Sequence, residues 1–169
     1  MKKMTMIFSF LIIVLLLLNG CNPAKVDEDE NIFKFKDSYV GDAGAVGNIT
    51  GRLPNPNGEQ LNGLELKTTD KPYGIILNYI DVEKSKDKET NYRELVLYNA
   101  TFILALVQNA DWVTFNFVEQ EFKVTRDALQ SLYGRDIKEF NNEIELSKFI
   151  QENSEDENKL IQFFNAHEN

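Results

Sequence analysis

The sequence is poor in the residues that most often carry out chemistry. Its 169 residues include one cysteine, Cys21, and one histidine, His167. A single cysteine excludes an intramolecular disulfide, and one cysteine with one histidine excludes a zinc site built from these two ligand types. Because His167 lies near the end of the sequence, where fraying is the default, we expect no Ser-His-Asp or Cys-His catalytic centre.

Positive charge is also scarce. The chain has 18 lysines and arginines against 27 acidic residues, which gives a formal net charge of −9. Without a basic cluster there is no electrostatic footprint for a phosphate backbone, so we expect no nucleic-acid partner.

The common metal and nucleotide motifs are missing. The alternating acids that begin at Asp81 resemble a calcium loop, but Lys86 stands where the EF-hand needs glycine and Tyr92 where it needs glutamate. The glycines between Gly41 and Gly51 fit neither a dinucleotide-binding motif nor a P-loop, and we interpret them as loop and close-packing glycines. The sequence therefore predicts no metal site, no cofactor and no catalytic residue.

The first apolar run is too short to span a membrane. It extends from Ile7 to Leu18 behind the basic residues Lys2 and Lys3, whereas a transmembrane helix needs about 20 apolar residues. This arrangement predicts that residues 1–20 form a secretory signal peptide.

The only cysteine follows this run directly. Leu18-Asn19-Gly20-Cys21 resembles a bacterial lipobox, with Asn19 in place of a smaller residue. The resemblance implies that Cys21 is acylated and becomes the first residue of the mature protein, and two acyl chains are enough for stable anchoring. The bilayer is thus an expected partner, at the extracytoplasmic face of the cell membrane. The acidic segment 21–31 has too few apolar side chains to fold and is predicted to be a tether.

Residues 32–169 alternate between strand and helix patterns and are predicted to form one α+β domain. We expect a small, mostly antiparallel sheet of three to four strands packed on one face against a buried central helix, with further helices at the C-terminal end. The first expected elements are a short helix after Asp42, a hairpin of strands at 64–67 and 73–79, and a buried helix at 95–107 capped by Asn91 and Glu94. They are followed by strands at 113–117 and 122–124 and by a helix from Thr125 to Gly134. Two more helices end the domain: one buries Ile144, Phe149 and Ile150, and the last begins at Ser154 and Glu157 and buries Leu160, Phe163 and Phe164.

Three groups of residues resemble a known family. They are the stretch from Tyr39 to Pro54, the stretch from Leu64 to Tyr79, and Thr125-Arg126 with Tyr133-Gly134. They are similar to domain of unknown function 4825, found in lipoproteins and extracytoplasmic segments of Gram-positive bacteria, some attached to membrane metallopeptidases of the antibiotic-sensing type. The similarity extends from Ile32 to about Ile150 and implies an extracytoplasmic sensory or interaction role, with no catalytic residues to carry over.

Three functions agree with these features. The first is a lipid-anchored binding, sensory or interaction module. The second is a cell-envelope hydrolase that uses paired carboxylates, although Trp112, Phe115 and Phe117 are expected in the core rather than in a substrate cleft. The third is an accessory lipoprotein that contacts a membrane or cell-envelope protein directly.

A candidate interaction surface lies near the start of the domain. Tyr39 and Asp42 introduce a glycine-rich helix beside the loop 54–58, and loops on a rigid scaffold often carry recognition. The alternative interpretation is that Asp42 is only a helix N-cap and that the glycines pack against the sheet.

Overall fold

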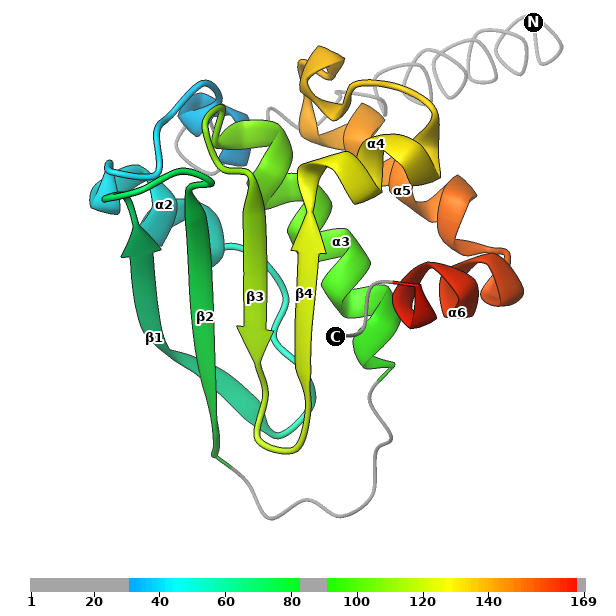
Figure 1. The fold of residues 1–169 in the computed structure, drawn as a ribbon, viewed down its shortest axis with the longest axis horizontal. Helices are drawn as coiled ribbons and strands as arrows, with labels where there is room; N and C mark the ends of the chain where they lie inside the picture. Colours follow the sequence, from blue (N-terminus) through cyan, green and yellow to red (C-terminus); the bar gives the residue numbers. More distant parts are fainter. Residues whose placement is uncertain (1–30, 83–90, 167–169) are drawn as a thin grey trace, which may run out of the picture. The chain divides into compact units, whose positions relative to one another are not determined.

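A computed structural model describes residues 31–82 and 91–166 of the chain (Figure 1). The predicted signal peptide, Cys21, most of the tether, the charged segment 83–90 and His167 lie outside the described residues. The described part is an α+β fold, as predicted: one four-stranded sheet with helices, several of them at the C-terminal end.

The sheet has the strand order β1–β2–β3–β4. Its strands are β1 (Glu59–Lys67), β2 (Gly74–Asp81), β3 (Trp112–Asn116) and β4 (Glu121–Thr125). The pairs β1–β2 and β3–β4 are antiparallel, whereas β2–β3 is parallel. The predicted hairpin and the short fourth strand are both present, so the sheet consists of two hairpins joined by a parallel seam.

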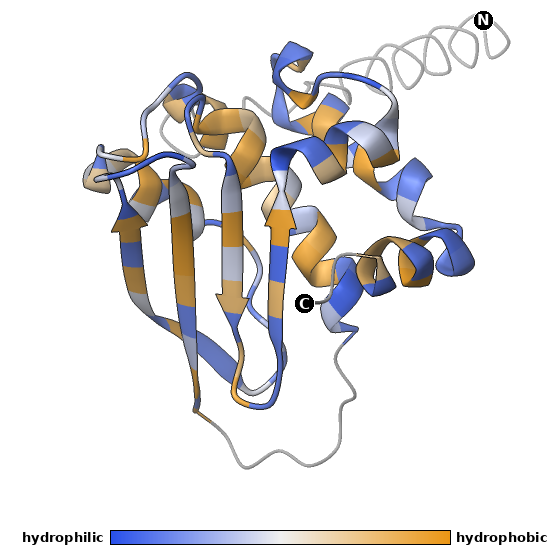
Figure 2. Cartoon of the chain, viewed as in Figure 1, coloured by the Kyte–Doolittle hydropathy of each residue, from blue (hydrophilic) through white to orange (hydrophobic). Residues whose placement is uncertain are grey.

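The central helix is α3 (Tyr92–Leu106), which connects β2 to β3 and carries ten buried residues. It packs against β3 and β4 on one side and against α5 (Glu143–Ser154) and α6 (Glu157–Asn165) on the other. Figure 2 shows α3 as largely hydrophobic, whereas β1 and β4 alternate between hydrophilic and hydrophobic residues. This pattern is typical of a buried helix beneath a sheet that is covered on one face.

The remaining elements flank this core. They are the 3-10 helices η1 (Ile32–Phe35) and η2 (Ile137–Glu139) and the helices α2 (Ala43–Thr50) and α4 (Arg126–Tyr133). The predicted caps are confirmed for α2, where Asp42 accepts from the amide of Ala45, and for α4, where Thr125 accepts from the amide of Ala128. Gly134 ends α4 in the left-handed region, with φ 68°, which glycine adopts without strain.

Two predictions about the C-terminal helices are wrong. Ile144 is 74% exposed, because α5 buries Leu146 and Ile150 one turn apart and Ile144 lies on the opposite face. Ser154 is the last residue of α5 and not the cap of α6, which is capped instead by Asp156 through the amide of Lys159. The break between the two helices thus comes later than the sequence pattern indicated.

Trp112 is not in the core with its aromatic neighbours. Phe115 and Phe117 are buried, but Trp112 is three positions before Phe115 and therefore lies on the other, open face of the sheet, where it is half-buried. There its indole covers Gly74 on the neighbouring strand and donates to the carbonyl of Pro72 (3.0 Å).

Candidate functional site

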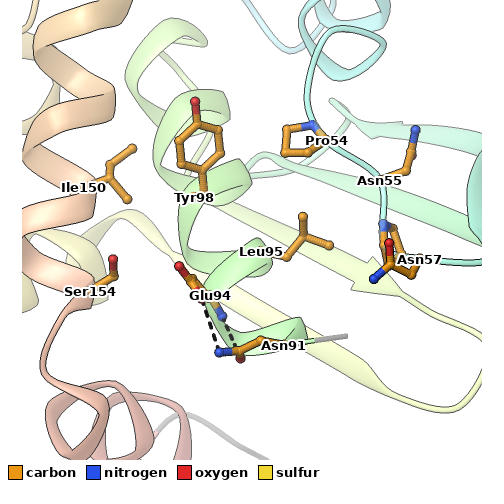
Figure 3. Close-up of a pocket in the computed structure, with 10 residues that line it drawn as sticks. Pro54, Asn55, Asn57, Asn91, Glu94, Leu95, Tyr98, Ile150 and Ser154 are labelled. Atoms are coloured by element: carbon orange, nitrogen blue, oxygen red, sulfur yellow. Dashed lines mark hydrogen bonds between the residues drawn. The ribbon is translucent and has the colours of Figure 1, made fainter. Parts of the chain in front are cut away.

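A cavity of about 350 Å³ lies over one face of α3 (Figure 3). Its floor is made by Asn91, Glu94, Leu95 and Tyr98, whose spacing of three and four residues places them on one helical stripe. One wall is the loop 54–57, and the other is the end of α5, which contributes Ile150 and Ser154. We call this site the α3 cavity.

The loop wall is held to the helix by a buried amide. Asn99, which is 1% exposed, donates from Nδ2 to the carbonyl of Pro54 (2.9 Å). The side chain of Asn55 accepts from the amide of Leu61 (3.3 Å), which ties the loop to β1. Pro56 is buried. These contacts give the loop a defined position although it contains no regular secondary structure.

The opposite wall is also tied to the floor. The hydroxyls of Tyr98 on α3 and Ser147 on α5 are hydrogen-bonded at 3.1 Å. Ile150, one turn further along α5, is buried and contributes an apolar surface to the cavity. Because both walls are hydrogen-bonded to α3, the cavity is formed without a ligand.

The floor changes from polar to apolar along the helix. At the polar end, Asn91 accepts from the amide of Glu94 (3.3 Å) and donates from Nδ2 to its carboxylate (3.3 Å). Asn91 therefore caps α3 as the sequence predicted, but Glu94 contacts the side-chain amide of Asn91 and not its backbone amide, as it would in a capping box. One turn further along, Leu95 and Tyr98 provide the apolar end, as Figure 3 shows. The site can therefore hold a group with a polar head and an apolar body.

A second polar cluster lies outside the α3 cavity. The carboxylate of Glu59, which is 9% exposed, accepts from the hydroxyl of Tyr92 and from the amide of Val118 (3.1 Å). Burial and the hydrogen bond from its hydroxyl to Glu59 raise the pKa of Tyr92 to about 12. This cluster joins β1, the start of α3 and the β3–β4 turn, so its role is structural.

Among the described residues that line the α3 cavity, Glu94 is the one with a carboxylate. The hydrolase alternative requires two carboxyls at a short, defined separation, and this described part of the lining contains one. Within residues 31–82 and 91–166, no group of three or more histidine, cysteine or acidic side chains is placed to hold a metal ion. In the same ranges, none of the helices has both the length and the apolar character needed to cross a membrane.

Tyr39 and Asp42 do not line the α3 cavity. Tyr39 is 57% exposed, and Asp42 acts as the N-cap of α2, at 2.9 Å from the amide of Ala45. A methyl group added at Gly41 or Gly47 would meet open space, so the prediction that these glycines pack closely is wrong. Tyr39, Gly41 and Asp42 are exposed on this surface.

Sequence reasoning found part of the site and missed the rest. The loop 54–58 was expected to lie beside a recognition surface, whereas Asn91 and Glu94 were recognised only as caps. The helical spacing of Asn91, Glu94, Leu95 and Tyr98 is visible in the sequence and places them on one face. Nothing local indicates that α5 leaves this face uncovered, because α5 lies more than forty residues further along the chain.

Comparison with known proteins extends this picture. The model of a family described as a domain of unknown function, DUF4825, matches residues 32–126. The match is shorter than the sequence resemblance indicated: it includes the loop wall and the floor of the α3 cavity and ends before α5. No curated protein and no solved structure matches the chain. Because the family model covers more than half of the sequence and includes the stretches around Tyr39 and Leu64 noted above, the chain belongs to the DUF4825 family.

Proposed function

We propose that this protein is a lipid-anchored binding module at the extracytoplasmic face of the cell membrane, and that the α3 cavity is its binding site. Anchoring is supported by the lipobox-like run Leu18-Asn19-Gly20-Cys21 and by the short apolar segment before it. One observation supports the binding role most strongly: an uncovered face of α3 lies between two walls, the loop 54–57 and the end of α5, and each wall is hydrogen-bonded to α3.

The composition of the cavity favours binding over catalysis. It combines apolar surface from Leu95, Tyr98 and Ile150 with a few polar groups, which is the usual make-up of a small ligand site. Its described lining residues include one carboxylate and neither histidine nor cysteine. Such a set can orient a ligand through hydrogen bonds, but it lacks a nucleophile with an adjacent base.

Anchoring is tested by metabolic labelling with a fatty acid. Cys21→Ala should abolish the label and release the protein from the membrane fraction, because Cys21 is the only thiol in the chain. Asn19→Ala is the matched control: it brings the run closer to the lipobox pattern and should keep the label. Label retained by Cys21→Ala would show that the anchor is elsewhere.

Binding at the cavity is tested separately, with a photo-reactive phenylalanine derivative placed at Ser154 in the full chain in cells. Ser154 lines the cavity, whereas Glu152 is exposed, does not line it and lies two positions from both Ile150 and Ser154, on the opposite face of α5. We expect a crosslinked adduct from position 154 and none from position 152. Equal crosslinking from both positions would mean that the cavity is not a specific site.

A further inference from the structure

We propose that the α3 cavity binds a short peptide segment with a basic side chain two positions from an apolar one. The basic head group would contact Glu94, and the apolar side chain would lie against Leu95, Tyr98 and Ile150. This inference rests on the proposed function in one respect, since it takes the α3 cavity as the binding site, and it adds the chemical class of the ligand.

The charge of the cavity favours a cationic ligand. Among the described residues that line it, Glu94 is the one charged residue, and neither lysine nor arginine belongs to this part of the lining. Asn91 donates to Oε2 of Glu94, and within the described residues the structure shows no partner for Oε1. A carboxylate oxygen at the polar end of the cavity is thus placed to accept from an ammonium or guanidinium group.

The N-terminus of α3 opposes a cation, but the opposition is the smaller effect. A helix N-terminus carries a partial charge of roughly +0.5, against the full negative charge of the Glu94 carboxylate. The amide of Glu94 is already satisfied by Asn91. The net charge of −9 on the chain adds a longer-range attraction for positive ligands.

The geometry of the floor sets the spacing of the ligand groups. From Glu94 to Tyr98 the helix rises about 6 Å, at 1.5 Å per residue. Residues two apart in an extended peptide are separated by about 7 Å and point to the same side. A basic residue over Glu94 therefore brings a residue two positions away, in either chain direction, over Leu95 and Tyr98. The volume of about 350 Å³ is at the small end for ligand sites and fits a few side chains rather than a folded partner.

Calorimetric titration of the mature, lipid-bearing chain in neutral detergent tests the inference. The probes are acetyl-Lys-Ser-Leu-amide, its glutamine and glutamate analogues, and acetyl-Lys-Ser-Ser-amide, which keeps the charge but removes the apolar group. We expect the lysine–leucine peptide to bind most tightly and the glutamate analogue most weakly. Equal binding of the lysine and glutamate peptides, or no heat from the lysine–leucine peptide, would overturn the proposal.

The chain offers a matched pair of variants. Glu94 and Glu145 each occupy the third position of a helix. The backbone amide of each donates to the side-chain oxygen of an asparagine N-cap, which is Asn91 for Glu94 and Asn142 for Glu145. Only Glu94 lines the cavity. Glu94→Gln should weaken binding of the lysine–leucine peptide about three- to fivefold at low salt, as expected for a partly exposed ion pair. Glu145→Gln removes the same net charge and should leave binding unchanged.

The outcomes separate the ligand class from the proposed function. Equal losses in Glu94→Gln and Glu145→Gln would assign the effect to net charge and overturn the proposed contact. Unchanged binding in Glu94→Gln would do the same. Fatty-acid labelling at Cys21 and crosslinking at Ser154 do not depend on the charge of the ligand, so they can succeed where the peptide titration fails. Thermal unfolding of both variants confirms that each is folded.

Discussion

Arg126 holds the C-terminal end of α3 through backbone carbonyl groups. Its guanidinium donates to the carbonyls of Leu104 (2.6 Å), Val107 (3.0 Å) and Ala110 (2.6 and 3.0 Å). The side chain is buried, and burial lowers its pKa. The last carbonyls of a helix have no hydrogen-bond donors within the helix and carry a partial negative charge. The guanidinium of an arginine supplies both the missing donors and a positive charge.

We expect Arg126→Ala to lower the free energy of unfolding by roughly 2–4 kcal/mol, because the carbonyls of Leu104 and Ala110 lose the donors that Arg126 supplies. The carbonyl of Val107 still accepts from the amide of Ala110. Arg126→Lys keeps the charge but cannot reach three carbonyls at once, and it should recover only part of the loss. Urea denaturation of both variants measures this. If the lysine variant were as stable as the wild type, charge alone would explain the role of Arg126.

Gly74 is required by the indole that covers it. A Cβ atom at this position would lie 2.0 Å from Cε2 of Trp112, well inside van der Waals contact. Gly74→Ala should therefore displace the ring and destabilise the protein by about 1–3 kcal/mol, the usual cost of overpacking. Trp112 is the only tryptophan in the chain, so its fluorescence reports the displacement directly.

Gly47→Ala is the matched control for Gly74→Ala. A Cβ atom at Gly47 meets nothing within 4 Å, and the residue lies inside α2. Alanine is favoured over glycine in a helix by about 1 kcal/mol, so this variant should be more stable than the wild type, with unchanged tryptophan emission. A loss of stability at Gly47 would indicate a contact on that face of α2.

At the scale of elements, α3 contributes most of the core. Leu104 is fully buried near its C-terminal end, next to Ile103 and Leu106, which are also fully buried. Leu104→Ala should cost about 2–5 kcal/mol, from the lost transfer energy of the side chain and the cavity that remains. The denaturation midpoint measures it, and a midpoint equal to that of the wild type would contradict a core role for this turn of α3.

Elements that depend on local signals were predictable from the sequence, and contacts between distant elements were not. Asp42, Asn91 and Thr125 predict where three helices begin, because the side chain of an N-cap residue accepts from a backbone amide within three residues of it. The buried face of α5 was harder to predict, because Ile144, Leu146 and Ile150 are all apolar and do not lie on one face. The structure buries Leu146 and Ile150 and leaves Ile144 exposed. The parallel pairing of β2 with β3 has no local signal, since it depends on how α3 packs.

The same division applies to the candidate site. The proline- and asparagine-rich loop 54–58 was predictable as an exposed turn, and Asn91 with Glu94 as a cap. The two features meet at the α3 cavity because Asn99 on α3 donates to the carbonyl of Pro54, a contact between residues 45 positions apart. A single sequence contains no record of such a contact.

For the molecule as a whole, three tyrosines link stability to alkaline pH. Burial raises the pKa values of Tyr79, Tyr92 and Tyr133 to about 12, from 10.0 in the unfolded chain. A tyrosine whose pKa is higher in the folded than in the unfolded state contributes its full stabilisation when the pH is below the unfolded pKa of 10.0. This stabilisation is lost as the pH rises from 10 to 12. We therefore expect the melting temperature to fall steeply in this range.

Substitution of single tyrosines checks this pH dependence. Tyr133→Phe removes one ionisable group, so its melting temperature should fall less steeply between pH 10 and 12 than that of the wild type. The variant also loses the hydrogen bond to Thr101 (2.8 Å) and should be less stable at neutral pH. Identical slopes for Tyr133→Phe and the wild type would contradict the assignment.

The parallel seam between β2 and β3 has a consequence for how the chain folds. Each hairpin closes through contacts between residues near in sequence, whereas the seam joins Gly74 to Trp112 across the whole of α3. Contacts of long sequence separation form slowly, because the entropy of closing the intervening chain is lost before the contact is gained. We therefore expect seam formation, with α3 docked, to be the slow step of folding. Trp112 pairs with Gly74 across the seam, so the fluorescence of this single tryptophan should report when the seam forms.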